Sequence, residues 1–290
     1  MVIATLWIAQ VVVFVGAWLG PWGEAGELGT TGRVTRPVRM LVSASLVLAA
    51  LLIYRDAGGV VFRYAAWVSL GMAASFVGDL IMARLIPVPS RLVGGMVAFG
   101  VGHACYVTGY VRTLHAAGQP VVGPALWLGL LGYGVVTVGG WWVAIRNPQR
   151  EQAVNVGALV YGSWIGVMAS VALALASALG GAWWATAAGA LSFVASDFLI
   201  GLTDIRGVRI RRANDWIWVT YVAGQWGSCT RGGSPAPGAE PCSSAGSICA
   251  PTARQCVRRW WAGRRRSSPC RTSSSSSRRC WARRAWTAGQ

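Results

Sequence analysis

The sequence predicts an all-α fold: a polytopic transmembrane helical bundle with seven complete spans plus a truncated eighth. Hydrophobic residues make up 54% of the chain and charged residues only 12%, whereas soluble domains carry about a quarter charged residues. A globule in water needs a charged surface, so this composition excludes an ordinary soluble domain. The apolar residues also lie in long runs, which indicate helices because lipid forces a spanning segment to satisfy its own backbone.

Seven segments are long and apolar enough to cross a bilayer, which takes about 20 residues. They cover residues 2–20, 38–54, 60–83, 92–111, 122–145, 154–178 and 183–203. An eighth segment begins at Asp215 and loses its apolar character after Gln225, which leaves about 11 residues, too few to cross. The first segment lacks the basic start and the cleavage site of a signal peptide, so we expect it to remain as a helix.

Arginine placement predicts the orientation of the bundle. When the loops are numbered in order, the odd loops carry eleven Arg and the even loops carry three, Arg55, Arg63 and Arg112. Cytoplasmic loops of membrane proteins are enriched in basic residues. We therefore expect an integral membrane protein of a bacterial-type cell membrane, with the odd loops in the cytoplasm and the N-terminus outside.

The end of the chain differs in composition from the rest. Residues 1–225 hold 14 Arg and 8 acidic residues, whereas residues 226–290 hold 12 Arg, one acid and six of the seven Cys. We expect a transmembrane helical domain over 1–225 and an Arg/Ser/Cys-rich, disordered tail over 226–290. A frameshift near codon 226 in GC-rich DNA is our hypothesis for this tail, and a genuine basic tail that binds acidic lipid or nucleic acid is the alternative. Eight crossings would leave the tail outside, so we expect no nucleic-acid partner.

Two carboxylates lie well within predicted spans, Asp79 in the third and Asp197 in the seventh. An ionisable side chain inside the membrane is costly and marks a candidate functional site. At 1.5 Å rise per residue, Asp79 lies about 7 Å and Asp197 about 10 Å from the same edge of the bilayer. We expect the two to meet in one pocket if their helices are neighbours. The structural alternative for each is a hydrogen bond between helices.

The sequences around the two carboxylates are alike. The string Ser75–Ile81 resembles Ser192–Ile200 with two extra residues. The two helices are four spans apart, as a duplicated four-helix unit requires, and such repeats often place a site at their interface. A chance match of short apolar strings is the alternative.

Other polar side chains fall within the predicted spans. His103 lies near the middle of the fourth span with Tyr106 one turn further on, and a hydrogen-bonded packing role for His103 stays open. The remaining polar residues of this kind are Asn155, Tyr161, Tyr221 and Gln225. With two His in the whole chain, a zinc site of three His is excluded, and we expect no metal and no cofactor.

Several short motifs together resemble those of the YhhN family of integral membrane proteins, the lysoplasmalogenases. They are Ser75–Met82, Phe99–Tyr106, Tyr161 with Met168, Gly189–Asp197 and Thr220–Gln225, with Arg36-Pro37 where the family tends to have Lys-Pro. The resemblance implies an eight-helix membrane hydrolase that cleaves the vinyl ether bond of lysoplasmalogens into a fatty aldehyde and a glycerophospho-base. As the two carboxylates within the spans, Asp79 and Asp197 are the expected catalytic residues. Supporting or substrate-binding roles fall to His103, Tyr106, Tyr161, Ser196, Tyr221 and Gln225.

The chemistry of vinyl ether hydrolysis suits a pair of carboxyl groups. A proton must be delivered to carbon, and the resulting oxocarbenium ion is attacked by water, which calls for one protonated and one ionised carboxyl group as in glycoside hydrolysis. Which aspartate is the acid stays open. The lysophospholipid would enter sideways from the bilayer, among membrane lipids, with its phosphate near Arg84, Arg91 or Arg206. These Arg also have a plain interpretation as anchors of the cytoplasmic side.

Two other classes of function stay open on the sequence alone. Paired intramembrane Asp also suit a proton-coupled small-solute transporter or a lipid-binding membrane protein without hydrolase activity. A structural or assembly role is the third, although it does not require both carboxylates at one depth. The sequence does not distinguish alkenyl from acyl lysolipids as substrates and does not indicate an oligomeric state.

Overall fold

The structure is a computed structural model that describes residues 34–57 and 59–229, together with scattered residues between positions 8 and 32. Most of the first predicted span, residues 2–20, and the predicted tail beyond Cys229 lie outside the described residues. The predicted division of the chain into a helical domain and a tail therefore stays a prediction.

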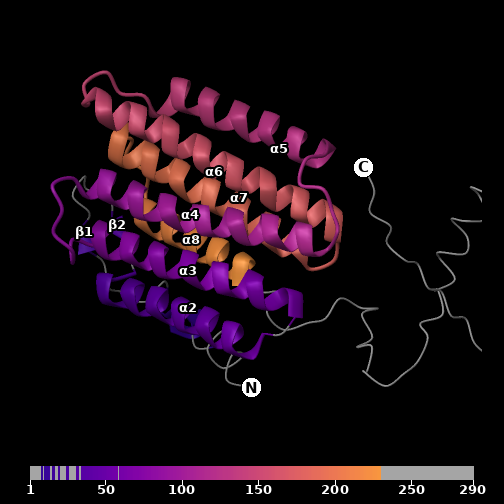
Figure 1. The fold of residues 1–290 in the computed structure, drawn as a ribbon. Helices are drawn as coiled ribbons and strands as arrows, with labels where there is room; N and C mark the ends of the chain where they lie inside the picture. The colour runs from indigo at the N-terminus through magenta and orange to yellow at the C-terminus, as the bar shows by residue number, and fades with distance from the viewer. Residues whose placement is uncertain are drawn as a thin grey trace, which may run out of the picture. The chain divides into compact units, whose positions relative to one another are not determined.

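The described part of the chain folds into long helices that run side by side, with α2 and α5 at opposite edges (Figure 1). The α-helices are α2 Arg36–Asp56, α3 Gly59–Met82, α4 Arg91–Ala116, α5 Pro124–Gly134, α6 Gln152–Leu179, α7 Trp183–Ile200 and α8 Ala213–Cys229. Two π-helical turns, η1 Val135–Gly139 and η2 Trp141–Ile145, continue α5, and a third, η3 Gly201–Ile205, continues α7. Two strands of two residues each, β1 Glu24–Ala25 and β2 Thr31–Gly32, pair antiparallel before α2.

Six helices among the described residues are long and apolar enough to cross a membrane. They are Arg36–Asp56, Val61–Met82, Arg91–Ala116, Pro124–Ile145, Gln152–Leu179 and Trp183–Ile205. These helices confirm the predicted spans from the second to the seventh, and with them the all-helical membrane fold. Their outer faces are apolar: Leu131, Val143 and Val160, for example, are each more than 60% exposed, as expected of side chains that face lipid rather than water.

The eighth helix ends four residues later than predicted. The loss of apolar character after Gln225 predicted its end there, but α8 continues to Cys229 and has 17 residues. Ser228 and Cys229 are buried in the bundle, so these small residues meet protein and need not be apolar enough for lipid. The last carbonyl groups of a helix lack donors within it. Here Tyr64 donates to the Ser228 carbonyl at 2.8 Å and Thr186 to the Gly227 carbonyl at 3.3 Å.

Two helix pairs, α3 with α4 and α7 with α8, make the most extensive contacts of the bundle. Each pair approaches closely through glycines, as is common between membrane helices. A Cβ added at Gly102 of α4 would lie 2.9 Å from the Gly71 carbonyl oxygen of α3, and one added at Gly189 of α7 would lie 2.8 Å from the Gly224 carbonyl oxygen of α8. Any side chain at these positions would force the helices apart.

The two helix pairs also share the spacing between glycine and carboxylate. Gly71 precedes Asp79 by eight residues, and Gly189 precedes Asp197 by eight residues. This equal spacing favours an alignment of α3 with α7 without a gap, which differs from the two extra residues of the sequence comparison. Short apolar strings match in several registers, whereas a backbone contact between helices permits one. The arrangement supports the predicted duplication of a four-helix unit.

Candidate active site

Asp79 lies on α3 in a closed polar environment. It is 6% exposed. Its Oδ2 accepts hydrogen bonds from the Ser43 hydroxyl of α2 and from the Tyr221 hydroxyl of α8, the latter at 2.7 Å. Two hydroxyl donors on one oxygen favour the ionised carboxylate, because a charged acceptor makes the stronger hydrogen bonds.

A row of hydrogen bonds continues from Tyr221 across the bundle. Gln225 Nε2 donates to the Tyr221 hydroxyl at 3.0 Å, and the Tyr106 hydroxyl of α4 donates to Gln225 Oε1 at 2.7 Å. Tyr106 and Gln225 are almost completely buried. The row joins α2, α3, α8 and α4, and every hydrogen bond in it runs toward Asp79. Three predicted supporting residues, Tyr106, Tyr221 and Gln225, are thus connected to this carboxylate.

We expect Gln225→Leu to destabilise the bundle, because it leaves the Tyr106 hydroxyl without an acceptor and the Tyr221 hydroxyl without a donor. An unsatisfied buried polar group costs about 1–3 kcal/mol, so the midpoint of unfolding in detergent should fall by several degrees for purified protein. Gln119→Leu, in an exposed loop, is the matched control. Equal midpoints for the two variants would contradict a stabilising role for this row.

Asp197 lies on α7 in a more open environment. The Tyr161 hydroxyl of α6 lies 3.4 Å from its Oδ2, a long hydrogen bond. Ser43 precedes Asp79 by 36 residues, and Tyr161 precedes Asp197 by 36 residues. In each half of the chain, a hydroxyl group of one helix therefore donates to a carboxylate of the next helix. Tyr161 and Asp197 both line a cavity, whereas Asp79 is enclosed.

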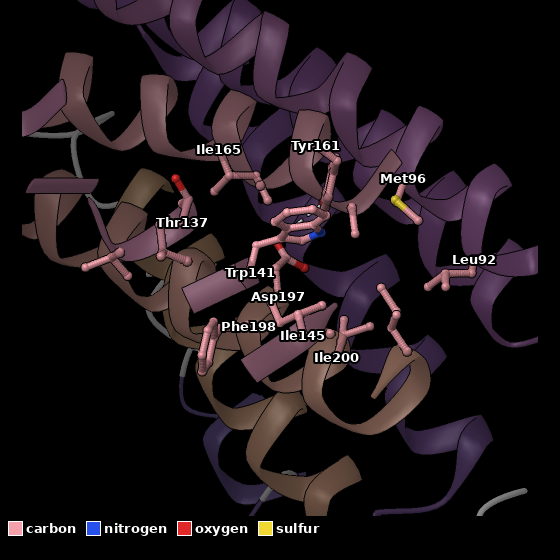
Figure 2. A pocket seen from close by; sticks show the side chains of 16 residues that line it. Leu92, Met96, Thr137, Trp141, Ile145, Tyr161, Ile165, Asp197, Phe198 and Ile200 are labelled. Atoms are coloured by element: carbon pink, nitrogen blue, oxygen red, sulfur yellow. Dashed lines mark hydrogen bonds between the residues drawn. The ribbon is translucent and has the colours of Figure 1, made fainter. Parts of the chain in front are cut away.

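The cavity lies among α4, α6, the end of α7 and the turns that follow α5, and has a volume of about 70 Å³. Figure 2 shows Asp197, Tyr161 and Trp141 at its centre, with Leu92 and Met96 to one side and Thr137 and Ile165 to the other. Within the described part of the chain, Asp197 is the one charged residue of its lining. All three π-helical turns contribute to the walls, and such turns are frequent at functional sites.

The two carboxylates do not share this cavity. Among the described residues, Asp79 does not line it, which differs from the expectation of one common pocket. The space beside Asp79 is filled by Tyr221, whose ring packs 5.8 Å from that of Phe193, one turn before Asp197 on α7. One carboxylate is therefore open to a ligand, and the other is enclosed behind aromatic rings.

His103 lies in the aromatic cluster between these two environments. It is 1% exposed, and its ring centroid lies 5.4 Å from that of Phe193 and 6.1 Å from that of Tyr161. Neither ring nitrogen has a hydrogen-bond partner among the described residues. Ser196, by contrast, is not part of the cluster around the carboxylates. Its hydroxyl donates to the Ile217 carbonyl at 3.1 Å and ties α7 to α8.

Charged residues surround one end of the cavity, next to Leu92 and Ile205. Arg91 NH2 lies 3.5 Å from Asp204 Oδ2, and Arg150 donates to the Asp204 carbonyl at 3.2 Å. Asp204 follows Asp197 by seven residues, which corresponds to about 10 Å along the helix. Of the three Arg expected near a phosphate, Arg91 lies at this rim, and Arg206 donates to the Arg146 carbonyl at 2.6 Å.

The sequence interpretation missed several residues that shape the site. Ser43 went unnoticed as one hydroxyl in an apolar span, although its spacing from Asp79 equals that of Tyr161 from Asp197. Phe193 and Trp141 also shape the site, and the sequence alone does not distinguish their roles from those of other apolar residues in membrane helices. The structure also places Gly162 in the cavity wall.

The comparison with protein families gives one match. The model of the YhhN family matches residues 34–228. The matched segment begins two residues before α2 and ends one residue before the end of α8, so it contains every residue of the cavity and both carboxylates. No match was found among curated proteins or among solved structures.

Proposed function

The chain belongs to the YhhN family, and on that premise we propose that it is a membrane hydrolase that cleaves the vinyl ether bond of lysoplasmalogen-type lysophospholipids. The products are a fatty aldehyde and a glycerophospho-base. The observation that carries the proposal is a single carboxylate, Asp197, in the wall of an otherwise uncharged, largely apolar cavity inside a membrane bundle. Such a cavity suits the aliphatic part of a lipid and offers one acid to it.

In the proposed reaction Asp197 is the general acid. It transfers its proton to the vinyl carbon that does not bear the oxygen, and the other carbon and the ether oxygen become an oxocarbenium ion. Water adds to that ion and returns a proton to Asp197. The resulting hemiacetal breaks its bond to the glycerol oxygen, which leaves as an alcohol, and the former vinyl carbons leave as the aldehyde.

Asp79 is proposed to act on the same reaction through its charge. Its two hydroxyl donors favour the ionised form, so it is assigned the ionised role while Asp197 holds the proton. A fixed negative charge near the cavity stabilises the developing oxocarbenium ion. The unpartnered ring nitrogens of His103 offer a position for the attacking water, since buried polar groups without protein partners commonly bind water.

The rim of the cavity suits the rest of the lysolipid. A phosphate at Arg91 would lie near Asp204, which is about 10 Å along the helix from Asp197, and the phosphate and the ether oxygen of a lysolipid are separated by a three-carbon glycerol. The vinyl ether bond would then lie next to the carboxyl group. Zwitterionic lysolipids have both charges at this end of the molecule, where Arg91 and Asp204 lie.

The proton transfer to carbon gives a specific test in heavy water. We expect the purified full-length protein to release aldehyde from an alkenyl lysophospholipid in D₂O with one deuterium on the carbon next to the carbonyl. Immediate borohydride reduction traps the aldehyde as an alcohol for mass spectrometry. Preformed aldehyde incubated with the protein in D₂O is the control for exchange, and an alkyl ether lysolipid is the control for the vinyl group.

Absence of aldehyde with the alkenyl lipid would overturn the proposal. In that case, tight binding of the same lipid would favour a lipid-binding protein. Proton uptake coupled to solute entry into proteoliposomes would favour a transporter.

A further inference from the structure

The cavity extends beyond the carboxylate to the lipid-facing surface of the bundle. Val136 of η1 lines it and is also 51% exposed on the outer surface. Gly162 of α6 lines the same region, and a Cβ added there would meet no atom of the described residues within 4 Å. Open space at Gly162 and an exposed cavity residue opposite indicate an opening between η1 and α6.

The opening begins where the packing of α5 on α6 ends. Farther along, the two helices are in close contact: an added Cβ at Gly129 would lie 2.9 Å from Ser170 Cα, and one at Gly166 would lie 3.4 Å from Tyr133 Cβ. Gly162 is one turn from Gly166, and at that level α5 has given way to the π-helical turn η1. An added Cβ at Gly166 also lies 3.5 Å from Cγ2 of Thr137 in η1, whereas one at Gly162 meets no described atom within 4 Å, so the contacts that close the interface at Gly166 are lost at Gly162.

We infer that the space between Val136 and Gly162 is a lateral portal for a single aliphatic chain. The inference rests on the proposed function and adds the route by which the substrate reaches the carboxylate. A lysolipid with its phosphate at Arg91 and its ether bond at Asp197 has most of its chain left over. The cavity, with a volume of about 70 Å³, is too small for a chain of many carbons. The remaining carbons pass between η1 and α6 into the bilayer.

The portal also selects against a second chain. One side of the portal consists of Tyr161 and Gly162, and the other consists of Thr137 and Val136. All four residues line the cavity. A glycine on one side provides room that any larger residue would fill. Gly162 is thus a specificity-determining residue: its missing side chain admits the lipid chain to the carboxylate.

The test uses an alkyl ether lysophospholipid, which has no vinyl group and is not cleaved, with a photoreactive diazirine in its chain. In nanodiscs holding the full-length protein, we expect crosslinks on the peptides that contain Val136 or Gly162. We expect Gly162→Leu to weaken binding of this lipid by about tenfold or more, because an overfilled apolar site loses its ligand. Val136→Phe narrows the portal from an exposed position, where folding tolerates the change, and should weaken binding likewise.

Gly132→Leu is the matched control. Gly132 lies on the exposed side of α5, an added Cβ there meets no described atom within 4 Å, and it does not line the cavity. Unchanged affinity in both portal variants, or crosslinks confined to other helices, would overturn the portal. Because the probe is never cleaved, a protein that binds it through the portal but releases no aldehyde from alkenyl lipid would refute the proposed hydrolysis alone. Cleavage that both portal variants leave intact would refute the portal alone.

Discussion

Asp197→Asn is expected to lower kcat for an alkenyl lysophospholipid by about 10²–10⁴-fold, the contribution typical of a positioned general acid. The amide keeps the shape of the side chain and an acceptor for the Tyr161 hydroxyl, but it has no proton to give to carbon. Since Asp197 lines the cavity without an ion-pair partner in its lining, the substitution should leave the fold and the binding of an alkyl ether lysolipid nearly unchanged. Aldehyde release measured at saturating substrate tests this.

Two comparisons make that result specific. Asp56→Asn changes an exposed carboxylate that pairs with Arg55 at 2.8 Å, and it should leave kcat unchanged. Asp79→Asn should lower kcat with little change in KM, because Asp79 is enclosed and acts on the transition state through its charge. If Asp197→Asn keeps most of its activity while Asp79→Asn loses it, the assignment of the acid to Asp197 is wrong.

Gly102→Ala is expected to destabilise the protein by about 3 kcal/mol, the upper end of the range for overfilling a packed interior. The added Cβ would lie 2.8 Å from the Ser75 hydroxyl and 2.9 Å from the Gly71 carbonyl oxygen. A hydroxyl can rotate away, but the backbone of α3 cannot move without disturbing Asp79, eight residues along the same helix. We therefore expect the free energy of unfolding in mixed detergent micelles to fall together with activity.

Gly100→Ala, on the same helix, is the control for backbone flexibility. An added Cβ at Gly100 meets no described atom within 4 Å, so the gain in helix propensity, up to about 1 kcal/mol, should appear as a small stabilisation. The two substitutions are chemically identical and should have opposite signs. The same sign for both would contradict the role given to the contact between α3 and α4.

Much of the fold was predictable, because each span in lipid has to satisfy its own backbone and so leaves an apolar run of the right length. The end of α8 was not. Gly227–Cys229 are small residues that are covered by protein, and burial by other helices leaves no signature in a local apolar count. The register between α3 and α7 that the glycine contacts favour is not evident from the sequence either, since it depends on which glycines touch across the interface.

The site was predictable in part for the same reason. Asp79 and Asp197 are conspicuous as charges in apolar spans, and the structure surrounds them with Tyr161, Tyr221 and Gln225, all of which were expected. Which carboxylate faces a cavity depends on the positions of Phe193 and of the turns after α5. These positions depend on tertiary packing. The sequence does not specify them, because a phenylalanine in a membrane span can pack equally well against many apolar surfaces.

The unequal lengths of the helices have a consequence for the membrane itself. With 28 residues α6 is about 42 Å long, and with 17 residues α8 is about 25 Å long, against a hydrocarbon core of about 30 Å. Hydrophobic mismatch acts on surfaces that touch lipid, such as the outer faces of α5 and α6, which respond by tilting. The short α8 instead packs on α7, α2 and α3. A change in the acyl chain length of the bilayer should therefore tilt the helices of the cavity wall. The hydrogen bonds to Asp79 on α3 should stay unchanged.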